Sequence, residues 1–169
     1  MTRKRKVLFL GRGNSVSSIM AEALVRELGG DSFEVFSAGA KPTTRVHPLA
    51  MAQLRPGISN LDLLSPKSWL EFTGEWAPRM DIVIAMCDQV ADHAHALPGQ
   101  PVLYHWHFGD PLAVGMTDAE RARSFEKTFW QILRRVNFFI AAQRHSMTIE
   151  QTLTTVERGS YGNAILMSG

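Results

Sequence analysis

The sequence predicts an α/β fold with a doubly wound, four-stranded parallel sheet, helices on both faces and a C-terminal helical extension. Three observations predict it. Short apolar runs typical of buried strands occur at residues 7–10 and 81–86. Apolar residues at helical spacing follow the first run, over residues 19–28. Strand and helix signals then alternate along the chain, which favours parallel strands joined by helices.

The first half of the chain contains two predicted strands and two predicted helices. A strand over residues 7–10 leads through a small, polar turn into a helix that stops at residues 28–31. Residues 33–37 alternate enough to form the second strand. The second helix starts within residues 46–50, with proline in its first turn, and residues 56–57 end it.

The second half adds two strands and a long helix. Strands are predicted at residues 81–86 and 102–106, with short helices near residues 67–73 and over residues 89–97. Asp118 can cap the final helix. Its core-facing stripe contains Phe125, Phe129, Ile132, Leu133, Val136 and Ile140.

Residues beyond this stripe suggest an extension. We expect Trp130 and Phe138, which lie off the stripe, to pack against the tail or a partner chain. Residues 148–157 can form a further helical segment. We therefore place the main domain at residues 1–145 and a C-terminal extension at residues 146–169.

Composition indicates a soluble protein with one sizeable core. The chain has 169 residues, 45% of them apolar and 20% charged, and a net charge of +2. No apolar run approaches the roughly 20 residues that cross a bilayer, and the single cysteine suits a reducing compartment. We interpret the basic residues 3–6 as a solvated chain end. We therefore predict a cytoplasmic protein that binds neither nucleic acid nor membrane.

Residues 11–18, between the first strand and the first helix, are mostly small and polar. Glycine and Asn14 accept left-handed backbone angles, so successive amide N–H groups can converge at the start of the helix. Such a loop is either an anion cradle or only a tight connection.

The loop resembles the catalytic loop of the low-molecular-weight protein tyrosine phosphatases and of the arsenate reductases that share their fold. The family motif is Cys-x5-Arg-Ser, and the matching residues here are Gly13, Asn14, Ser15, Ser18 and the run at 20–22. Other similar segments lie at residues 36–39, 46–50, 81–88 and 105–111. The resemblance spans residues 6–142 and implies the phosphotyrosine phosphatase I-like fold. Leu112 and Ala113 replace a frequent tyrosine pair, so the chain is more similar to the arsenate reductase branch.

The motif departs at the two positions that carry the chemistry. Gly11 occupies the nucleophile position and Ser17 the arginine position. Losing one member of a nucleophilic unit costs a factor of about 10⁶ in rate, and losing a transition-state arginine about 10³ to 10⁵. We therefore predict a catalytically inactive homologue that still binds phosphate, sulfate or an arsenate-like oxyanion. The candidate binding residues are Arg12, Gly13, Asn14, Ser15, Val16, Ser17 and Ser18.

Asp110 and Cys87 match further positions of the family. The resemblance places Asp110 at the general acid, and without a nucleophile we interpret it as a vestigial acid that caps a loop or turn. Cys87 matches a relay cysteine of thioredoxin-coupled arsenate reductases, but the second relay position is Ala94. We therefore interpret Cys87 as a buried small apolar residue. We also expect Trp69 and Trp76 to be packing residues.

Four histidines, His93, His95, His105 and His107, raise the question of a metal. His105 and His107 alternate on a strand and could face one ion. No nearby cysteine or paired carboxylates complete the ligand set, so we predict no metal and no cofactor.

Two other functions stay open. The chain could be an enzyme in which water or a loop serine attacks, with Asp110 as acid and Arg12 as charge stabiliser. It could instead be an interaction protein without an anion site, in which Trp130, Phe138 or the tail contacts a protein partner.

Overall fold

A computed structural model describes the backbone of residues 3–166 and the side chains of residues 3–159. Its centre is a four-stranded sheet in the order β2-β1-β3-β4, with every neighbouring pair parallel. The strands are β1 (Arg5–Gly11), β2 (Phe33–Gly39), β3 (Ile82–Ala85) and β4 (Val102–His105). The predicted fold class is confirmed.

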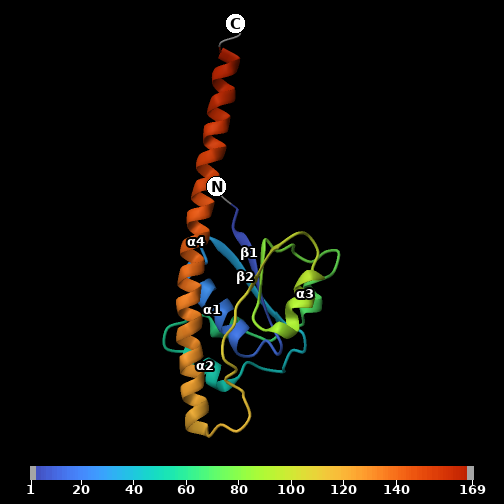
Figure 1. Ribbon diagram of the computed structural model, residues 1–169, viewed down its shortest axis with the longest axis vertical. Helices are drawn as coiled ribbons and strands as arrows, with labels where there is room; N and C mark the ends of the chain where they lie inside the picture. The colour runs from blue at the N-terminus through green and yellow to red at the C-terminus, as the bar shows by residue number, and fades with distance from the viewer. Residues whose placement is uncertain (1–2, 167–169) are drawn as a thin grey trace. The chain divides into compact units, whose positions relative to one another are not determined.

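Helices occupy both sides of this sheet, and Figure 1 shows α1 and α3 on opposite sides. The α-helices are α1 (Ser17–Gly29), α2 (Pro48–Leu54), α3 (Ala91–His95) and α4 (Asp118–Leu166). Three 3₁₀ helices are η1 (Leu61–Leu63), η2 (Trp69–Phe72) and η3 (Asp88–Val90). The helix predicted near residues 67–73 is thus the 3₁₀ helix η2, and the one predicted over residues 89–97 is divided between η3 and α3.

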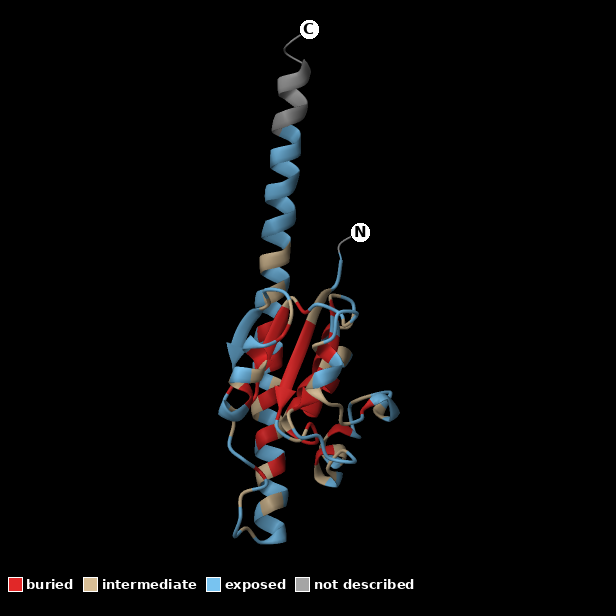
Figure 2. Cartoon of the chain, turned by 90° about the vertical axis from the view of Figure 1, so that its right-hand side faces the viewer, coloured by how far each residue is buried: buried red, intermediate tan, exposed pale blue. Residues whose placement is uncertain are grey.

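The core is built on β1, whose residues Val7, Leu8, Phe9 and Leu10 are fully buried. On one face Leu8 and Leu10 pack in a cluster with residues of β2, β3 and α3. Phe9, which points to the other face by strand alternation, contacts Trp106 at 5.5 Å between ring centroids. Figure 2 shows the strands of the sheet centre in the buried class. Each such side chain contributes about 1.5–3 kcal/mol by leaving water.

The final helix begins as predicted and buries most of the predicted stripe. Phe125, Ile132, Val136 and Ile140 are buried, whereas Phe129 and Leu133 are half-buried. Trp130 is 54% exposed and Phe138 72% exposed. The predicted segment at residues 148–157 belongs to α4 without a break.

The chain comprises two compact units, residues 1–136 and 137–169. The boundary at residue 145 stays a prediction. Trp69 packs partly against the core cluster, but Trp76 is 94% exposed, so the prediction that Trp76 packs was wrong. Among the described residues, no helix has the length and apolarity needed to cross a membrane.

Candidate functional site

The candidate site is a pocket of about 770 Å³ at the carboxyl ends of β1, β3 and β4. The chain leaves β1 for β2 on one side and returns to β3 on the other, so the strand order reverses between β1 and β3. Open α/β sheets bind ligands at such a reversal. The pocket is lined by residues 11–18, 41, 43, 86–89 and 107–112.

Four backbone carbonyls at and after the end of β1 accept hydrogen bonds from the segment at residues 40–47. The carbonyl oxygens of Gly11, Arg12 and Gly13 accept from the N–H groups of Ala40, Lys41 and Thr43, at 3.1, 2.8 and 3.0 Å. Ser15 O accepts from His47 N at 3.0 Å. In contrast, the amide N–H groups of residues 12–18 donate to no acceptor within the described part of the chain. The loop therefore offers donors to a ligand.

The start of α1 adds to this set of donors. Val16 occupies the cap position with φ −129° and ψ −95° and provides no side-chain hydrogen bond. The first turn contains no acidic residue. The first amides of the helix and the positive end of its dipole thus remain uncompensated beside the pocket.

Asn14 fixes the loop. Its φ is 51°, in the left-handed region that asparagine tolerates, and its side chain is 2% exposed. The Nδ2 atom donates to Ser18 Oγ at 3.0 Å and to Ser37 Oγ at 2.8 Å, while Oδ1 accepts from Lys67 N at 2.9 Å. All polar atoms of this side chain are therefore used within the protein, and only its backbone N–H is available to an anion.

A buried carboxylate accepts a hydrogen bond from Ser37, one of the partners of Asn14. Glu22, 1% exposed, accepts from Ser37 Oγ at 3.1 Å and from Arg26 Nη1 at 3.2 Å, and its Oε1 lies 3.6 Å from Lys67 Nζ. Sequence reasoning missed this role. The available signal was its position three residues after Ile19, which places Glu22 on the buried face of α1.

Two glycines are required by the close approach of chain segments. A Cβ atom on Gly11 would lie 2.7 Å from Ser18 Oγ, so that hydroxyl fills the space beside residue 11. A Cβ atom on Gly39 would lie 2.8 Å from Arg12 O and 3.0 Å from Asn14 N. Gly39 therefore lets β2 approach the loop.

The remaining predicted site residues also line the pocket. Arg12 is exposed, and Asp110 is exposed with its Oδ1 accepting from Leu112 N at 2.9 Å, the geometry of a turn. Cys87 was expected to be buried, and it is half-buried: two residues beyond the end of β3, it packs against the core cluster and also lines the pocket.

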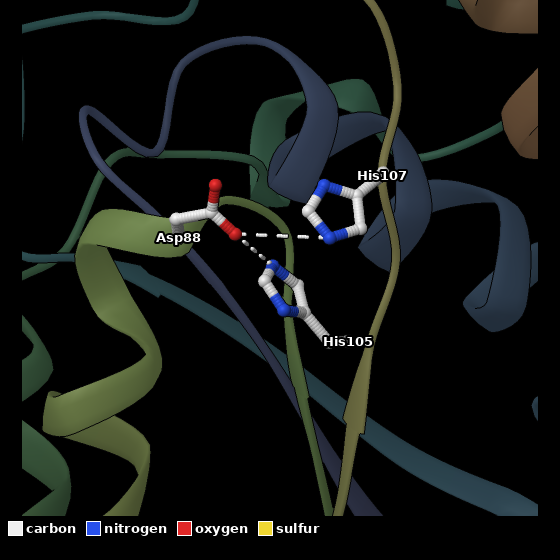
Figure 3. A group of neighbouring side chains, drawn as sticks. All are labelled: Asp88, His105 and His107. Atoms are coloured by element: carbon white, nitrogen blue, oxygen red, sulfur yellow. Dashed lines mark ion pairs between the residues drawn. The ribbon is translucent and has the colours of Figure 1, made fainter.

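Asp88, His105 and His107 converge at the rim of the pocket (Figure 3). Asp88 Oδ1 lies 3.3 Å from His105 Nε2 and 3.7 Å from His107 Nε2. The sequence offered no paired carboxylates for the histidines, and it did not indicate that the single carboxylate of Asp88 lies beside them. That contact depends on the pairing of β3 with β4, which sequence separation conceals.

Comparison with known proteins places the chain in a family. The family model described as low molecular weight phosphotyrosine protein phosphatase matches residues 6–147. The chain belongs to this family.

Within the phosphatase family, the chain is similar to proteins named as arsenate reductases. It is 31% identical over 137 residues to an arsenate reductase of Halalkalibacterium halodurans, covering 80% of this chain and 95% of that protein. It is 29% identical over 120 residues to arsenate reductase 1 of Staphylococcus saprophyticus, covering 71% of this chain and 88% of the relative.

Solved structures agree on the phosphatase family fold. An arsenate reductase in the phosphate binding state has a TM-score of 0.66 and 27% identity, covering 82% of this chain and 98% of the other. A tyrosine phosphatase of Erwinia amylovora has a TM-score of 0.65 over 83% of this chain and 94% of the other, and at 16% identity it shows the fold alone.

Proposed function

We propose that this member of the phosphatase family is a binding protein for tetrahedral oxyanions, with phosphate, arsenate and sulfate as candidate ligands, and does not turn them over. One observation carries the proposal. The amide N–H groups of residues 12–18 have no acceptor within the described chain, at the uncapped start of a helix and inside a pocket. Such groups form an anion site without any charged side chain.

The absence of a negatively charged nucleophile favours anion binding. In an enzyme with a thiolate at the base of the loop, the nucleophile repels the incoming anion. Gly11 carries no such charge here. Arg12 and Lys41 line the same pocket, where their positive charges offset those of Asp88 and Asp110. One relative was solved in the phosphate binding state, in agreement with this ligand class.

Gly11 and Ser17 lack the groups that turnover requires. Gly11 has no side chain, and the space next to it is filled by the Ser18 hydroxyl. Ser17 carries no charge to stabilise equatorial oxygens. Asp110 is engaged by a backbone N–H of its own turn. Because unaided phosphate monoester hydrolysis is among the slowest reactions known, these losses leave no usable rate.

Binding is tested by calorimetry on two variants that differ only in charge. Ser17→Asp places a carboxylate among the loop amides, whereas Ser17→Asn has the same shape without charge. Ser17→Asp should fold because an acidic residue in the first turn of a helix is stabilising, and Ser17→Asn should fold because asparagine has the same size as aspartate at this half-buried position. Like charges about 4 Å apart near a protein surface repel by about 4 kcal/mol, so Ser17→Asp should bind phosphate at least tenfold more weakly than Ser17→Asn.

Equal phosphate affinity of the two variants would show that the anion does not bind at the loop. No heat from the unmodified protein at millimolar phosphate, arsenate or sulfate would favour an interaction protein without an anion site.

Inactivity is tested with aryl phosphate hydrolysis and thiol-dependent arsenate reduction. The expected result is no rate above that of buffer in either assay. Turnover that persists in Cys87→Ala and decreases in Asp110→Asn would establish an enzyme with an unusual nucleophile and overturn this part of the proposal.

A further inference from the structure

We propose that Asp88, His105 and His107 form a binding site for a divalent transition-metal ion, with Zn²⁺ as the best fit. The three side chains come from two segments, the end of β4 and the turn after β3 (Figure 3). None of them contributes to the loop at residues 11–18, so the site goes beyond the proposed oxyanion function.

The strand ladder fixes the two histidines on one side. His105 is paired with Ala85 of β3, and Trp106 N continues the ladder by donating to Ala85 O at 2.9 Å. Trp106 is 4% exposed and contacts Phe9 in the core. Because successive side chains of an extended chain point to opposite sides, His105 and His107 both point away from this core contact.

The distances match those of a metal site. Possible ligand atoms of the three residues all lie within 4.8 Å of one another. His105 Nε2 and His107 Nε2 are 3.3 and 3.7 Å from the same oxygen, Asp88 Oδ1. Ligands of a tetrahedral zinc ion, at about 2.1 Å from the metal, are about 3.4 Å apart. The site therefore needs little rearrangement to close around an ion.

A simple surface ion pair explains these contacts less well. One imidazole is enough to pair with a carboxylate, whereas two converge here on one oxygen. Their ring centroids are 4.0 Å apart with an interplanar angle of 35°. A shared cation accounts for all three orientations together.

The donor set selects the class of metal. Two imidazole nitrogens and one carboxylate oxygen suit Zn²⁺ and its neighbours, while Mg²⁺ and Ca²⁺ prefer oxygen ligands alone. Three protein ligands leave a coordination position open. Asp88 and His107 line the pocket that also contains residues 11–18, so the open position is accessible from the pocket.

The exposure of the three side chains determines how tightly we expect Zn²⁺ to bind. The side chains of His105, His107 and Asp88 are 33%, 67% and 81% exposed. Within residues 3–159, no group other than Asp88 forms a hydrogen bond or ion pair with the two imidazoles. Such groups raise metal affinity by about 10- to 100-fold, so we expect this site to bind Zn²⁺ more weakly by about that factor than a site whose imidazoles are oriented.

The test is titration of the tag-free, full-length protein with ZnCl₂ in a buffer without phosphate. One ion should bind per chain. His105→Ala, His107→Ala and Asp88→Asn should each bind at least tenfold more weakly, because even the loss of an orienting group costs about that much. His95→Ala, which removes an exposed histidine on α3, and Cys87→Ala should bind as the unmodified protein does.

Co²⁺ provides a second readout. Binding at the site should give visible absorption of a four- or five-coordinate ion in the unmodified protein and in His95→Ala, but not in His107→Ala. No Zn²⁺ binding by the unmodified protein, equal affinity in His105→Ala and His107→Ala, or loss of binding in Cys87→Ala would each overturn the proposal. The titration contains no oxyanion, so its failure leaves the proposed oxyanion function unaffected, and the reverse also holds.

Discussion

Asn14 shows how one side chain can position a whole loop. It adopts a left-handed φ of 51°, and its side chain forms three hydrogen bonds, with Ser18, Ser37 and the backbone of Lys67. These partners belong to α1, to β2 and to the segment that precedes η2. The loop conformation therefore depends on contacts between residues far apart in the sequence.

Replacing Asn14 should be costly. Asn14→Ala leaves the N–H of Lys67 and the hydroxyl oxygens of Ser18 and Ser37 without this partner. Each buried polar group left unsatisfied costs about 1–3 kcal/mol, so the free energy of unfolding should fall by about 2–4 kcal/mol. Urea unfolding measures this. Ser17→Ala, on the same loop, serves as control and should change stability by less than about 0.5 kcal/mol. A similar small loss in Asn14→Ala would show that the loop is not held by this side chain.

His47 gives the protein a pH dependence of known sign. Burial, followed by the nearby charges of Arg121 and Arg45, lowers the pKa of His47 below its ordinary value of 6.5. Its Nδ1 accepts from Leu49 N at 3.1 Å at the start of α2, which requires that nitrogen to be unprotonated. The unfolded chain therefore binds the proton more readily, and stability should decrease as pH falls through about 6.5.

A comparison of urea midpoints at pH 7.5 and pH 5.5 tests this linkage. The unmodified protein should lose more stability over the interval than His47→Asn, in which asparagine can still cap α2 without titrating. The difference between the two proteins isolates His47 from other titrating groups. An equal loss in both would contradict the assignment.

The chemistry of the candidate site residues could be predicted in part from the sequence. The missing thiol at Gly11 and the missing charge at Ser17 follow from letters aligned with a known motif. The motif does not reveal that Asn14 fixes the loop or that Asp88 lies close to the histidines, because both depend on tertiary contacts. Cys87 illustrates the same limit: an apolar run predicts burial, but a residue just beyond a strand faces the pocket.

At the scale of elements, the unit formed by β1, the loop and α1 depends on how closely β2 approaches it. Gly39, the last residue of β2, pairs with Gly11 and sits against the backbone of Arg12 and Asn14. Both strands end at the same level, so the loop passes directly over the end of β2. A side chain at residue 39 has no space there.

Gly39→Ala should therefore disturb the loop. Its Cβ would meet Arg12 O at 2.8 Å, and overpacking of this kind costs about 1–3 kcal/mol. Phosphate affinity should fall with stability, because the same backbone carries the amides. Gly57→Ala is the matched control, since no atom lies within 4 Å of its added Cβ. Calorimetry with phosphate and urea unfolding measure both effects, and equal behaviour of the two variants would contradict this role of Gly39.

Element boundaries were predicted with uneven success for physical reasons. The strands were found from short apolar or alternating runs, and the long helix from apolar residues at helical spacing. The segment at residues 67–73 forms the 3₁₀ helix η2, capped by Ser68 Oγ through Leu70 N at 3.2 Å. So short a segment contains too few turns to distinguish 3₁₀ from α geometry by pattern.

At the scale of the whole molecule, the sheet order explains where the pocket lies, and sequence alternation alone was enough to predict a parallel sheet. It did not predict which strands are neighbours, and the Asp88–His105 contact follows only from that order. The C-terminal extension was predicted as helical, and residues 148–159 of α4 are exposed throughout.

Removing residues 146–169 should therefore cost little. Of the described side chains in this stretch, none is buried, so the loss of apolar contacts is small. The thermal midpoint should shift by less than about 3 °C, which corresponds to about 1 kcal/mol for a chain of this size. Phosphate affinity should stay within twofold. A larger drop in either quantity would show that the main domain extends past residue 145.

The Ser18 hydroxyl beside Gly11 limits which side chains residue 11 can carry. A cysteine at residue 11 would require that hydroxyl to move, since a Cβ there would stand 2.7 Å from the oxygen. Asn14 tethers the hydroxyl in its present place. A thiol at residue 11 and a guanidinium at residue 17 would thus need an accompanying adjustment at residue 18. The cysteine and arginine of the family motif are therefore more than one substitution away from this loop.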